Sequence, residues 1–128
     1  MKKKLDAAYG VIGLGRFGEA LATMLAQSGN EVIAVDKDEK KIREIRQYTD
    51  CAFVADNLSA DTLKEIGIQN CDVVIICIGE QVDVSVLTTM SVIEMGVPRV
   101  IAKALSPEQG AVLEKLGAEV VYPERDMA

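Results

Sequence analysis

A glycine-spaced turn near the N-terminus constrains the fold more than any other feature of the sequence. Gly13, Gly15 and Gly18 follow the apolar run 7–12 with the spacing G-x-G-x-x-G. Glycines at this spacing let a strand turn tightly into a helix, let the backbone approach phosphate, and let helix and strand pack closely. An acid, Asp36, ends the next apolar run about 20 residues further on, as the same pattern requires. The turn therefore predicts a strand, a turn and a helix that together bind the phosphates of a nucleotide.

The rest of the chain alternates short apolar runs with segments whose apolar residues have helical spacing. We predict strands at residues 7–12, 31–35, 52–54, 72–78, 99–102 and 119–121. Most are rich in Val and Ile without alternation, which is typical of parallel strands covered by helices on both faces. The sequence thus predicts an α/β fold, a Rossmann-like doubly wound parallel sheet of about six strands in the order 3-2-1-4-5-6.

Residues suited to helix ends fall between these runs. Four glycines separate a helical segment from the next strand, where a left-handed residue commonly ends a helix. They are Gly29, Gly67, Gly96 and Gly117. Helix starts are expected at Asp38, Ser59 and Ser106, because short polar side chains accept hydrogen bonds from the first free N–H groups of a helix.

Length and composition narrow the class of protein. The 128 residues match one domain, so residues 1–128 are assigned to a single nucleotide-binding unit. A net charge of −6 with dispersed basic residues argues against nucleic acid as a partner. No apolar run approaches the roughly 20 residues of a membrane span, so no direct membrane insertion is expected. Cys51, Cys71 and Cys77 form no Cys-x-x-Cys pair and the chain has no histidine, which predicts reduced, buried thiols.

The glycine turn and the acid that follows define the core of the predicted site. Asp36 is expected to accept hydrogen bonds from ribose hydroxyls and to repel the 2′-phosphate of NADP, and Lys37 beside it is included in the site. Arg16 and Phe17 lie within the turn. A cation at the positive end of a helix dipole is unfavourable, and a phosphate-rich ligand would explain it. The alternative is a solvated arginine on the first helical turn.

Other strand ends lead to the same crevice. Asp56 and Asn57 offer an acceptor and an amide to an adenine edge, although such residues also serve as caps or turns. Gly79 permits close approach of the backbone to a sugar, with Glu80 next to it. Lys103 is placed to meet phosphate, although a lone lysine after a strand is commonly just solvated.

Several motifs spread over nearly the whole chain resemble those of a known family. They are residues 11–18 (VIGLGRFG), 35–38 (VDKD), 78–79, 87–89 (LTT), 102–104 (AKA), 112–117 (VLEKLG) and 123–127 (PERDM). Together they resemble the N-terminal domain of the regulator of potassium conductance (RCK), most closely that of Ktr-type and next of Trk-type cytoplasmic potassium-uptake subunits.

This resemblance implies a regulator and not an enzyme. Such subunits form homodimers and octameric rings in the cytoplasm, beneath a membrane-embedded potassium-translocating subunit at the inner face of the cell membrane. ATP, ADP or NAD(H) in the crevice changes the shape of the ring and so gates transport.

The resemblance also implies roles for individual residues. The three glycines would cradle phosphates, Asp36 would hold ribose, and Asp56 and Asn57 would lie by adenine. Arg16 would approach the terminal phosphate of ATP, that of the adjoining subunit. Glu124 would lie at the dimer junction and help to hold a divalent cation, Mg²⁺ or Ca²⁺. The rest of the pocket would be lined by Ile78, Gly79, Glu80 and Lys103.

Two departures from the family pattern limit the transfer. Ktr-type subunits can place a histidine after the fifth strand, whereas this chain has residues 106–110 (SPEQG) there. Full-length subunits continue into a crossover helix and a C-terminal ligand-binding domain, both of which are absent from these 128 residues.

Two other functions compete with the regulatory one. An NAD-binding domain of an oxidoreductase would need acid–base groups, for which only Tyr48 and Tyr122 are apparent, neither clearly facing a nicotinamide. An assembly module with a structural nucleotide would need an apolar outer surface. Val84, Leu87, Met90 and Met95 form a candidate stripe, but we expect it to face the sheet, because every helix of this fold buries one face.

Overall fold

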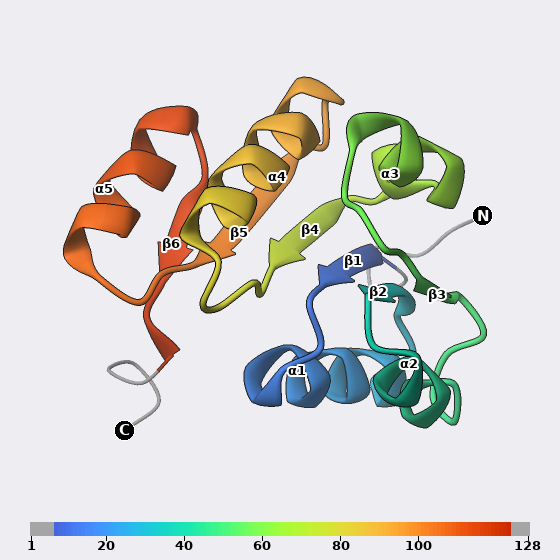
Figure 1. The fold of residues 1–128 in the computed structure, drawn as a ribbon. Coiled ribbons are helices and arrows are strands. Elements are labelled where there is room, and N and C mark those ends of the chain that lie inside the picture. Colours follow the sequence, from blue (N-terminus) through green and yellow to red (C-terminus); the bar gives the residue numbers. More distant parts are fainter. Residues whose placement is uncertain (1–6, 124–128) are drawn as a thin grey trace.

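The computed structural model describes residues 7–123, which form a six-stranded sheet with helices on both faces (Figure 1). The strands are β1 (Ala8–Ile12), β2 (Glu31–Asp36), β3 (Ala52–Val54), β4 (Val73–Ile76), β5 (Arg99–Lys103) and β6 (Glu119–Val121). The helices are α1 (Arg16–Gln27), α2 (Glu39–Ile45), α3 (Ala60–Ile66), α4 (Val82–Glu94) and α5 (Pro107–Leu116), with a short 3-10 helix at Ile68–Asn70.

All neighbouring strands pair in parallel, in the order β3-β2-β1-β4-β5-β6. The predicted Rossmann-like fold and strand order are therefore confirmed. The chain first builds outward from β1 to β3 and then returns to the other side of β1 to place β4. This reversal leaves β1 and β4 side by side in the middle of the sheet, with Ile12 opposite Ile76.

The largest boundary error is at the fourth strand. The sequence predicts residues 72–78, whereas β4 covers Val73–Ile76. Pairing with β5 ends at Ile76, after which the chain bends toward the start of α4. Ile78 and Gly79 therefore lie in a loop at the carboxyl edge of the sheet, which is where a ligand of this fold would be met.

Each face of the sheet has its own apolar core. α1 and α2 cover one face, and α3, α4 and α5 cover the other (Figure 1). Neighbouring residues of one strand serve opposite faces, because side chains alternate along a strand. Val11 packs in the cluster that includes Ile42 of α2, whereas Ile12 packs in the cluster that includes Val92 of α4 and Leu113 of α5.

The predicted helix ends are confirmed. Asp38, Ser59 and Ser106 each cap a helix, with the side chain accepting from the N–H of Lys40, Thr62 and Gln109 respectively. All four predicted stop glycines have positive φ, namely Gly29, Gly67, Gly96 and Gly117. Within residues 7–123, no helix is both long and apolar enough to cross a bilayer.

The orientation of α4 contradicts a prediction. Leu87 and Met90 were expected to face the sheet, but their side chains are 62% and 37% exposed. Val84 and Met95 of the same stripe are only half-buried. The prediction of a sheet-facing stripe was therefore wrong for its two central residues.

Small side chains explain this orientation. The buried residues of α4 are Ser85, Thr88, Thr89 and Val92. Thr89 Oγ1 donates a hydrogen bond to the carbonyl oxygen of Ser85 at 2.8 Å, so the buried hydroxyl is satisfied within the helix. A face of short side chains lets the helix lie close to the sheet and turns its larger apolar residues outward.

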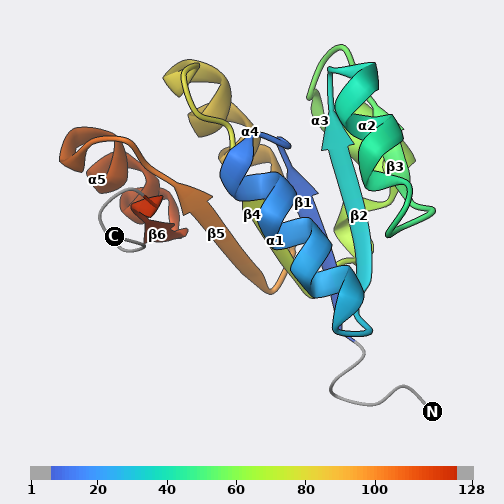
Figure 2. The same ribbon diagram turned by 90° about the horizontal axis from the view of Figure 1, so that it is seen from below.

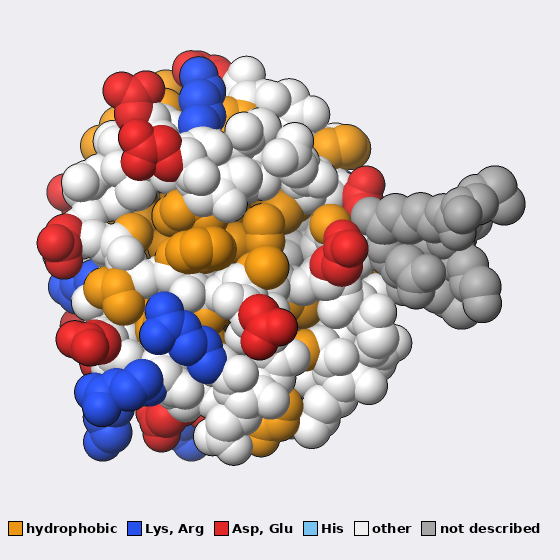
Figure 3. All heavy atoms as spheres, turned by 90° about the vertical axis from the view of Figure 1, so that its right-hand side faces the viewer, with side chains coloured by type: hydrophobic (Ala, Val, Ile, Leu, Met, Phe, Trp, Pro, Cys, Tyr) orange, Lys and Arg blue, Asp and Glu red, His pale blue; other side chains and the backbone are white. Residues whose placement is uncertain are grey.

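The β3 edge of the sheet is a second place where apolar side chains are exposed. Figure 3 looks onto this side and shows hydrophobic side chains gathered at its centre, with Lys and Arg side chains at the lower left. Phe53 and Val54 of β3 are exposed. Arg46 Nη2 donates a hydrogen bond to the carbonyl oxygen of Ala52 at 3.1 Å. This charged side chain occupies part of the open edge and so limits pairing with a further strand.

The cysteines divide into two classes. Cys71 and Cys77 are buried as predicted, but Cys51 is exposed, because it lies in the loop before the edge strand β3. Burial raises the pKa of Cys77 to about 12, although the charge of nearby Lys103 acts to lower it. The Cys77 thiol therefore stays protonated at neutral pH.

Thiol labelling tests this division. We expect Cys51 to react with a water-soluble disulfide reagent in the native protein, and Cys71 and Cys77 to react only when the chain unfolds, because thiolate and access are both required. Counting labelled thiols before and after denaturation measures the effect. The Cys51→Ser variant is the control, and rapid native labelling of that variant would contradict the burial.

Candidate nucleotide-binding site

The loops after β1, β2, β3, β4 and β5 open at one edge of the sheet. Because all the strands are parallel, their carboxyl ends point the same way (Figure 2). The strand order reverses between β1 and β4, and the ligand crevice of a doubly wound sheet opens at such a point. The fold therefore gathers the predicted site residues of these loops along one edge.

The glycine turn is held by close packing at two of its three glycines. Gly13 has a φ of 100°, and a Cβ there would lie 2.9 Å from the backbone of Cys77. A Cβ at Gly18 would overlap the carbonyl oxygen of Gly13. The Gly13 N–H donates to the carbonyl oxygen of Val35 at 2.8 Å. These contacts explain why the strand can turn into α1 directly above β4.

Gly15 is different, because the fold itself does not require a glycine there. Its φ of −69° is ordinary for any residue, and a Cβ at this position would meet no atom within 4 Å. It immediately precedes α1, and no side chain caps that helix. The first N–H groups of a helix lack partners within the helix and carry its positive dipole end. The open space at Gly15 thus gives an anion close access to these groups.

Asp36 lies across from the turn and is hydrogen-bonded to it. Its Oδ2 accepts from the Leu14 N–H at 2.6 Å, and its Oδ1 accepts from the Asp38 N–H at 2.8 Å. Each carboxylate oxygen has two acceptor sites, so both retain one for a ligand hydroxyl. The carboxylate is therefore fixed in place while still able to accept hydrogen bonds from a ribose. Lys37, beside it, is exposed.

Asp56 and Asn57 follow β3 at the same edge, and both are exposed. The Asn57 Oδ1 accepts from the Ser59 N–H at 3.1 Å and from the Thr62 hydroxyl at 2.9 Å. Asn57 therefore builds the turn into α3, which is the alternative that the sequence left open. A role in turn formation leaves the Asn57 amide group and the Asp56 carboxylate to face a ligand.

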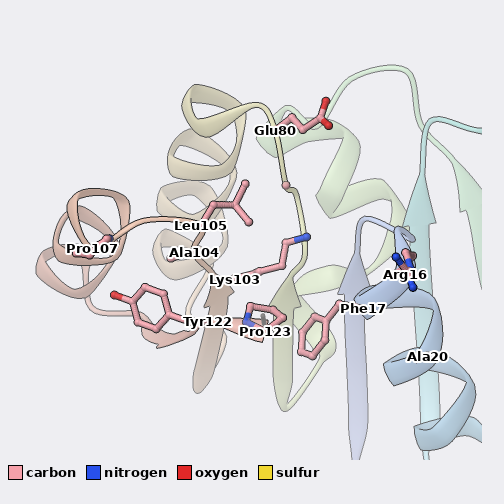
Figure 4. Close-up of a pocket in the computed structure, with 11 residues that line it drawn as sticks. Arg16, Phe17, Ala20, Glu80, Lys103, Ala104, Leu105, Pro107, Tyr122 and Pro123 are labelled. Carbon is pink, nitrogen blue, oxygen red and sulfur yellow. The ribbon is translucent and has the colours of Figure 1, made fainter. Parts of the chain in front are cut away.

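A pocket of about 1100 Å³ lies on the other side of the glycine turn, beside β4, β5 and β6. Lys103 at the end of β5, Phe17 in α1 and Tyr122 just after β6 extend toward it (Figure 4). Its lining also includes Arg16, Gly79, Glu80, Leu105 and Pro123. The Lys103 ammonium approaches Gly79, where a Cβ would lie 3.2 Å from Nζ. Site residues predicted from separate loops thus share one cavity. The structure places Ile78 next to this lining, half-buried and packed against the apolar core.

Sequence reasoning missed Tyr122 as a pocket residue. Its position after the last strand gives no sign that it faces the site, yet its ring forms part of the wall. Its hydroxyl points toward α5 (Figure 4), where a side chain at Gly110 would overlap it. Gly110 of α5 therefore provides the space that seats Tyr122. The pairing joins two residues that no sequence motif connects.

A second residue was also missed. Lys41 of α2 lines a smaller hollow together with Leu14, Gly15 and Arg16. A lysine within a charged helix gives no local signal, so only the packing of α2 beside α1 reveals its position. Glu124, the predicted cation ligand, lies outside the described residues. Within residues 7–123, no cluster of three or more acidic, Cys or His side chains could hold a metal ion.

A family model matches this architecture over nearly its whole length. The model of the TrkA-N domain covers residues 9–123, from within β1 to just beyond β6. The chain belongs to the TrkA-N domain family. The resemblance to the N-terminal RCK domain of Ktr and Trk potassium-uptake systems is confirmed by this match and by the relatives below.

Two curated relatives of this TrkA-N domain are potassium uptake proteins. Ktr system potassium uptake protein C of Bacillus subtilis (strain 168) is 42% identical over 129 residues, which cover 100% of this chain and 57% of that protein. Ktr system potassium uptake protein A of Vibrio alginolyticus is 41% identical over 123 residues, covering 95% and 56%. The chain therefore spans little more than half the length of either relative.

Solved structures share the fold at lower identity. The TrkA-N domain of the inner membrane protein ybaL from Escherichia coli superposes with a TM-score of 0.81 at 18% identity, covering 98% of this chain and 93% of that one. A GsuK structure bound to ADP has a TM-score of 0.78 at 23% identity, covering 97% and 32%. The GsuK channel bound to NAD has a TM-score of 0.78 at 14% identity, covering 99% and 23%.

The contrast between two glycines of the turn makes a testable prediction. We expect Gly18→Ala to lower the free energy of unfolding by about 1 to 3 kcal/mol, because its Cβ would overlap the turn. Gly15→Ala should cost less than about 1 kcal/mol, because its Cβ enters open space and only the helix-capping preference changes. Urea unfolding without nucleotide measures both. Equal losses would show that the turn does not pack as described.

Proposed function

We propose that this TrkA-N domain is the nucleotide-binding part of a cytoplasmic regulatory subunit that gates a membrane potassium transporter. ATP, ADP or NAD(H) at the carboxyl edge of the sheet would set the conformation of the subunit. The potassium-translocating partner would hold it at the inner face of the cell membrane. The Ktr relatives, which are potassium uptake proteins, support this function.

One observation carries the proposal. Gly15 has neither the backbone conformation nor the packing that would demand a glycine, yet it lies at the uncapped start of α1. A phosphate group approaching the helix N–H groups needs this space. Asp36, already oriented by two backbone N–H groups, lies across from it and suits a ribose. A nucleotide carries both groups, a phosphate and a ribose, next to each other.

Other predicted site residues along this edge could contact the adenine, the ribose and the phosphates of a nucleotide. Asp56 and Asn57, after β3, would lie by the adenine, with Lys37 close to the ribose. Gly13, Gly18 and Phe17 would border the phosphates, and Lys103 would meet them from β5. Ile78, Gly79 and Glu80 would line the rest. Structures of this fold include GsuK bound to ADP and the GsuK channel bound to NAD.

A divalent cation would reach this site chiefly through the nucleotide. Magnesium bound with nucleotides typically uses one or two carboxylates together with phosphate oxygens and water. Glu124 is the carboxylate proposed for this role, with Mg²⁺ or Ca²⁺ as the ion.

The outer surface of α4 supports assembly into homodimers and an octameric ring. Leu87 and Met90 expose apolar side chains on it, and Val82 near its start is also exposed. Neighbouring apolar residues on one helix mark an interaction surface when no part of the same chain covers them. A second copy of the chain is the proposed occupant.

An NAD-dependent oxidoreductase domain is the second candidate function. Its specific support is the pocket of about 1100 Å³, which has room beside β4, β5 and β6 for the second half of a dinucleotide. Against it, the chain has no histidine, and the Tyr122 hydroxyl is directed to Gly110 of α5. Tyr48 is exposed beyond α2, away from this pocket. We therefore propose a sensor without catalytic activity.

Calorimetric titration with ATP, ADP, NAD and NADH tests the site. We expect Asp36→Ala to weaken every adenosine nucleotide by about 1.5 to 3 kcal/mol, because hydrogen bonds to a charged group are lost. Asp50→Ala, an exposed acid before β3, is the matched control and should change nothing. Unchanged binding to Asp36→Ala would remove the ribose assignment, and hydride transfer from NADH to a substrate would favour the oxidoreductase.

A sensor must also distinguish its ligands. A nucleotide that binds two conformations of the protein with equal affinity does not change the equilibrium between them. We expect Arg16→Ala to weaken ATP far more than ADP, because the guanidinium would pair with the terminal phosphate. Titrations with both nucleotides measure the ratio. Equal losses would mean that Arg16 does not contact the terminal phosphate.

A further inference from the structure

A second hollow lies beside the glycine turn, on the side of α2. It has a volume of about 330 Å³ and is lined by Leu14, Gly15, Arg16, Glu19, Ala20 and Lys41. Arg16 also lines the larger pocket of Figure 4, so its side chain stands between the two cavities. The hollow is therefore an extension of the proposed nucleotide site and not a separate region of the molecule.

The fold of α2 directs Lys41 to this hollow. Ile42 and Ile45 are buried in the core on the same side of the sheet as α1, which fixes the rotation of the helix. Lys41, next to Ile42, is half-buried and lines the hollow, whereas Lys40 is exposed and does not. Two adjacent lysines of one short helix thus have different surroundings.

Asp36 forms hydrogen bonds with both sides of the hollow, the glycine turn and the start of α2. One carboxylate oxygen accepts from Leu14 in the glycine turn, and the other accepts from Asp38 at the start of α2. Asp38 in turn caps α2 by accepting from the Lys40 N–H at 2.9 Å. The position of Lys41 relative to Gly15 therefore follows from hydrogen bonds that exist without a ligand.

The two cations that line the hollow, Arg16 and Lys41, make no ion pair among the described residues. Glu19 is the acid in the wall; both Glu19 and Arg16 are exposed, whereas Lys41 is half-buried. Two cations that share one hollow repel each other, and the positive end of the α1 dipole adds to the cost. An anion bound between them would offset this repulsion.

We propose that Lys41 and Arg16 form a subsite for the terminal phosphate of a nucleoside triphosphate. The inference rests on the proposed function. It adds Lys41 as a residue that distinguishes a triphosphate from a diphosphate. The planar guanidinium pairs with two phosphate oxygens, and the ammonium adds a compact positive charge. A diphosphate bound at the same glycine turn leaves this subsite without a phosphate. Lys41 is thus a determinant of the preference between ATP and ADP.

Matched charge removals on α2 test the proposal. We expect Lys41→Gln to weaken ATP by about ten- to a hundredfold, the equivalent of one charge-assisted hydrogen bond, and to leave ADP within about twofold. Lys41→Arg should retain most of the ATP affinity. Lys40→Gln removes the same charge one residue away and should bind both nucleotides like the wild type. Calorimetry measures affinity, and thermal unfolding without nucleotide confirms that each variant folds.

The proposal is overturned if Lys41→Gln weakens ATP and ADP equally, or if Lys40→Gln has the same effect as Lys41→Gln. Inorganic tripolyphosphate separates this failure from failure of the proposed function. A wild-type protein that binds neither ATP nor ADP refutes the nucleotide sensor. Tripolyphosphate then decides the subsite: weaker binding to Lys41→Gln than to Lys40→Gln supports it, and equal binding refutes it.

The terminal phosphate can come from the nucleotide of the same chain or of a second copy. A mixture of Asp56→Ala and Lys41→Gln chains distinguishes these sources, because Asp56 is exposed and does not line the hollow. If the phosphate crosses between copies, mixed pairs regain a tight ATP site, because intact Asp56 of one chain and intact Lys41 of the other then act on the same nucleotide. If it stays within one chain, no tight site returns. Tight ATP binding by the mixture therefore assigns the phosphate to a second copy, and its absence assigns the phosphate to the same chain.

Discussion

The close approach of the glycine turn to β4 is the constraint on which the rest of this structure depends. Gly13 packs on the backbone of Cys77, and Gly18 packs on the carbonyl of Gly13, so α1 begins directly above the centre of the sheet. No side chain fits at either contact. This geometry aims the start of α1 at the point where the strand order reverses, and the cavities on both sides of Arg16 follow from it.

Asp36 connects this turn to the rest of the edge. A carboxylate at the end of β2 would be costly to hold rigidly without partners, but two backbone N–H groups from different elements orient it. The glycine turn, the end of β2 and the start of α2 are consequently one hydrogen-bonded unit. A ligand that contacts this unit binds to groups that are already ordered. Binding is favoured because the entropic cost of ordering the site is small.

Much of the fold could be predicted, because its signals are local. Runs of Val and Ile marked the strands, and capping residues and glycines marked the helix ends, so the order of the sheet followed. The predicted site residues of the first four strand ends and Lys103 do lie along one edge. Their ligand roles stay predictions. What failed depends on packing between distant segments. Apolar residues occur all around α4, so periodicity could not select the buried face. Lys41 and Tyr122 entered the site only through the placement of α2 beside α1 and of β6 beside α5.

The orientation of α4 has a consequence for how firmly the domain holds together. A helix that meets its sheet with Ser85, Thr88 and Thr89 gains little from the hydrophobic effect on that side, while Leu87 and Met90 remain in water. A second copy of the chain, the occupant proposed for this surface, would cover these side chains in the folded state only. By mass action, that contact would raise the melting temperature as the protein is concentrated, and thermal stability would then depend on the assembly as well as on the single chain.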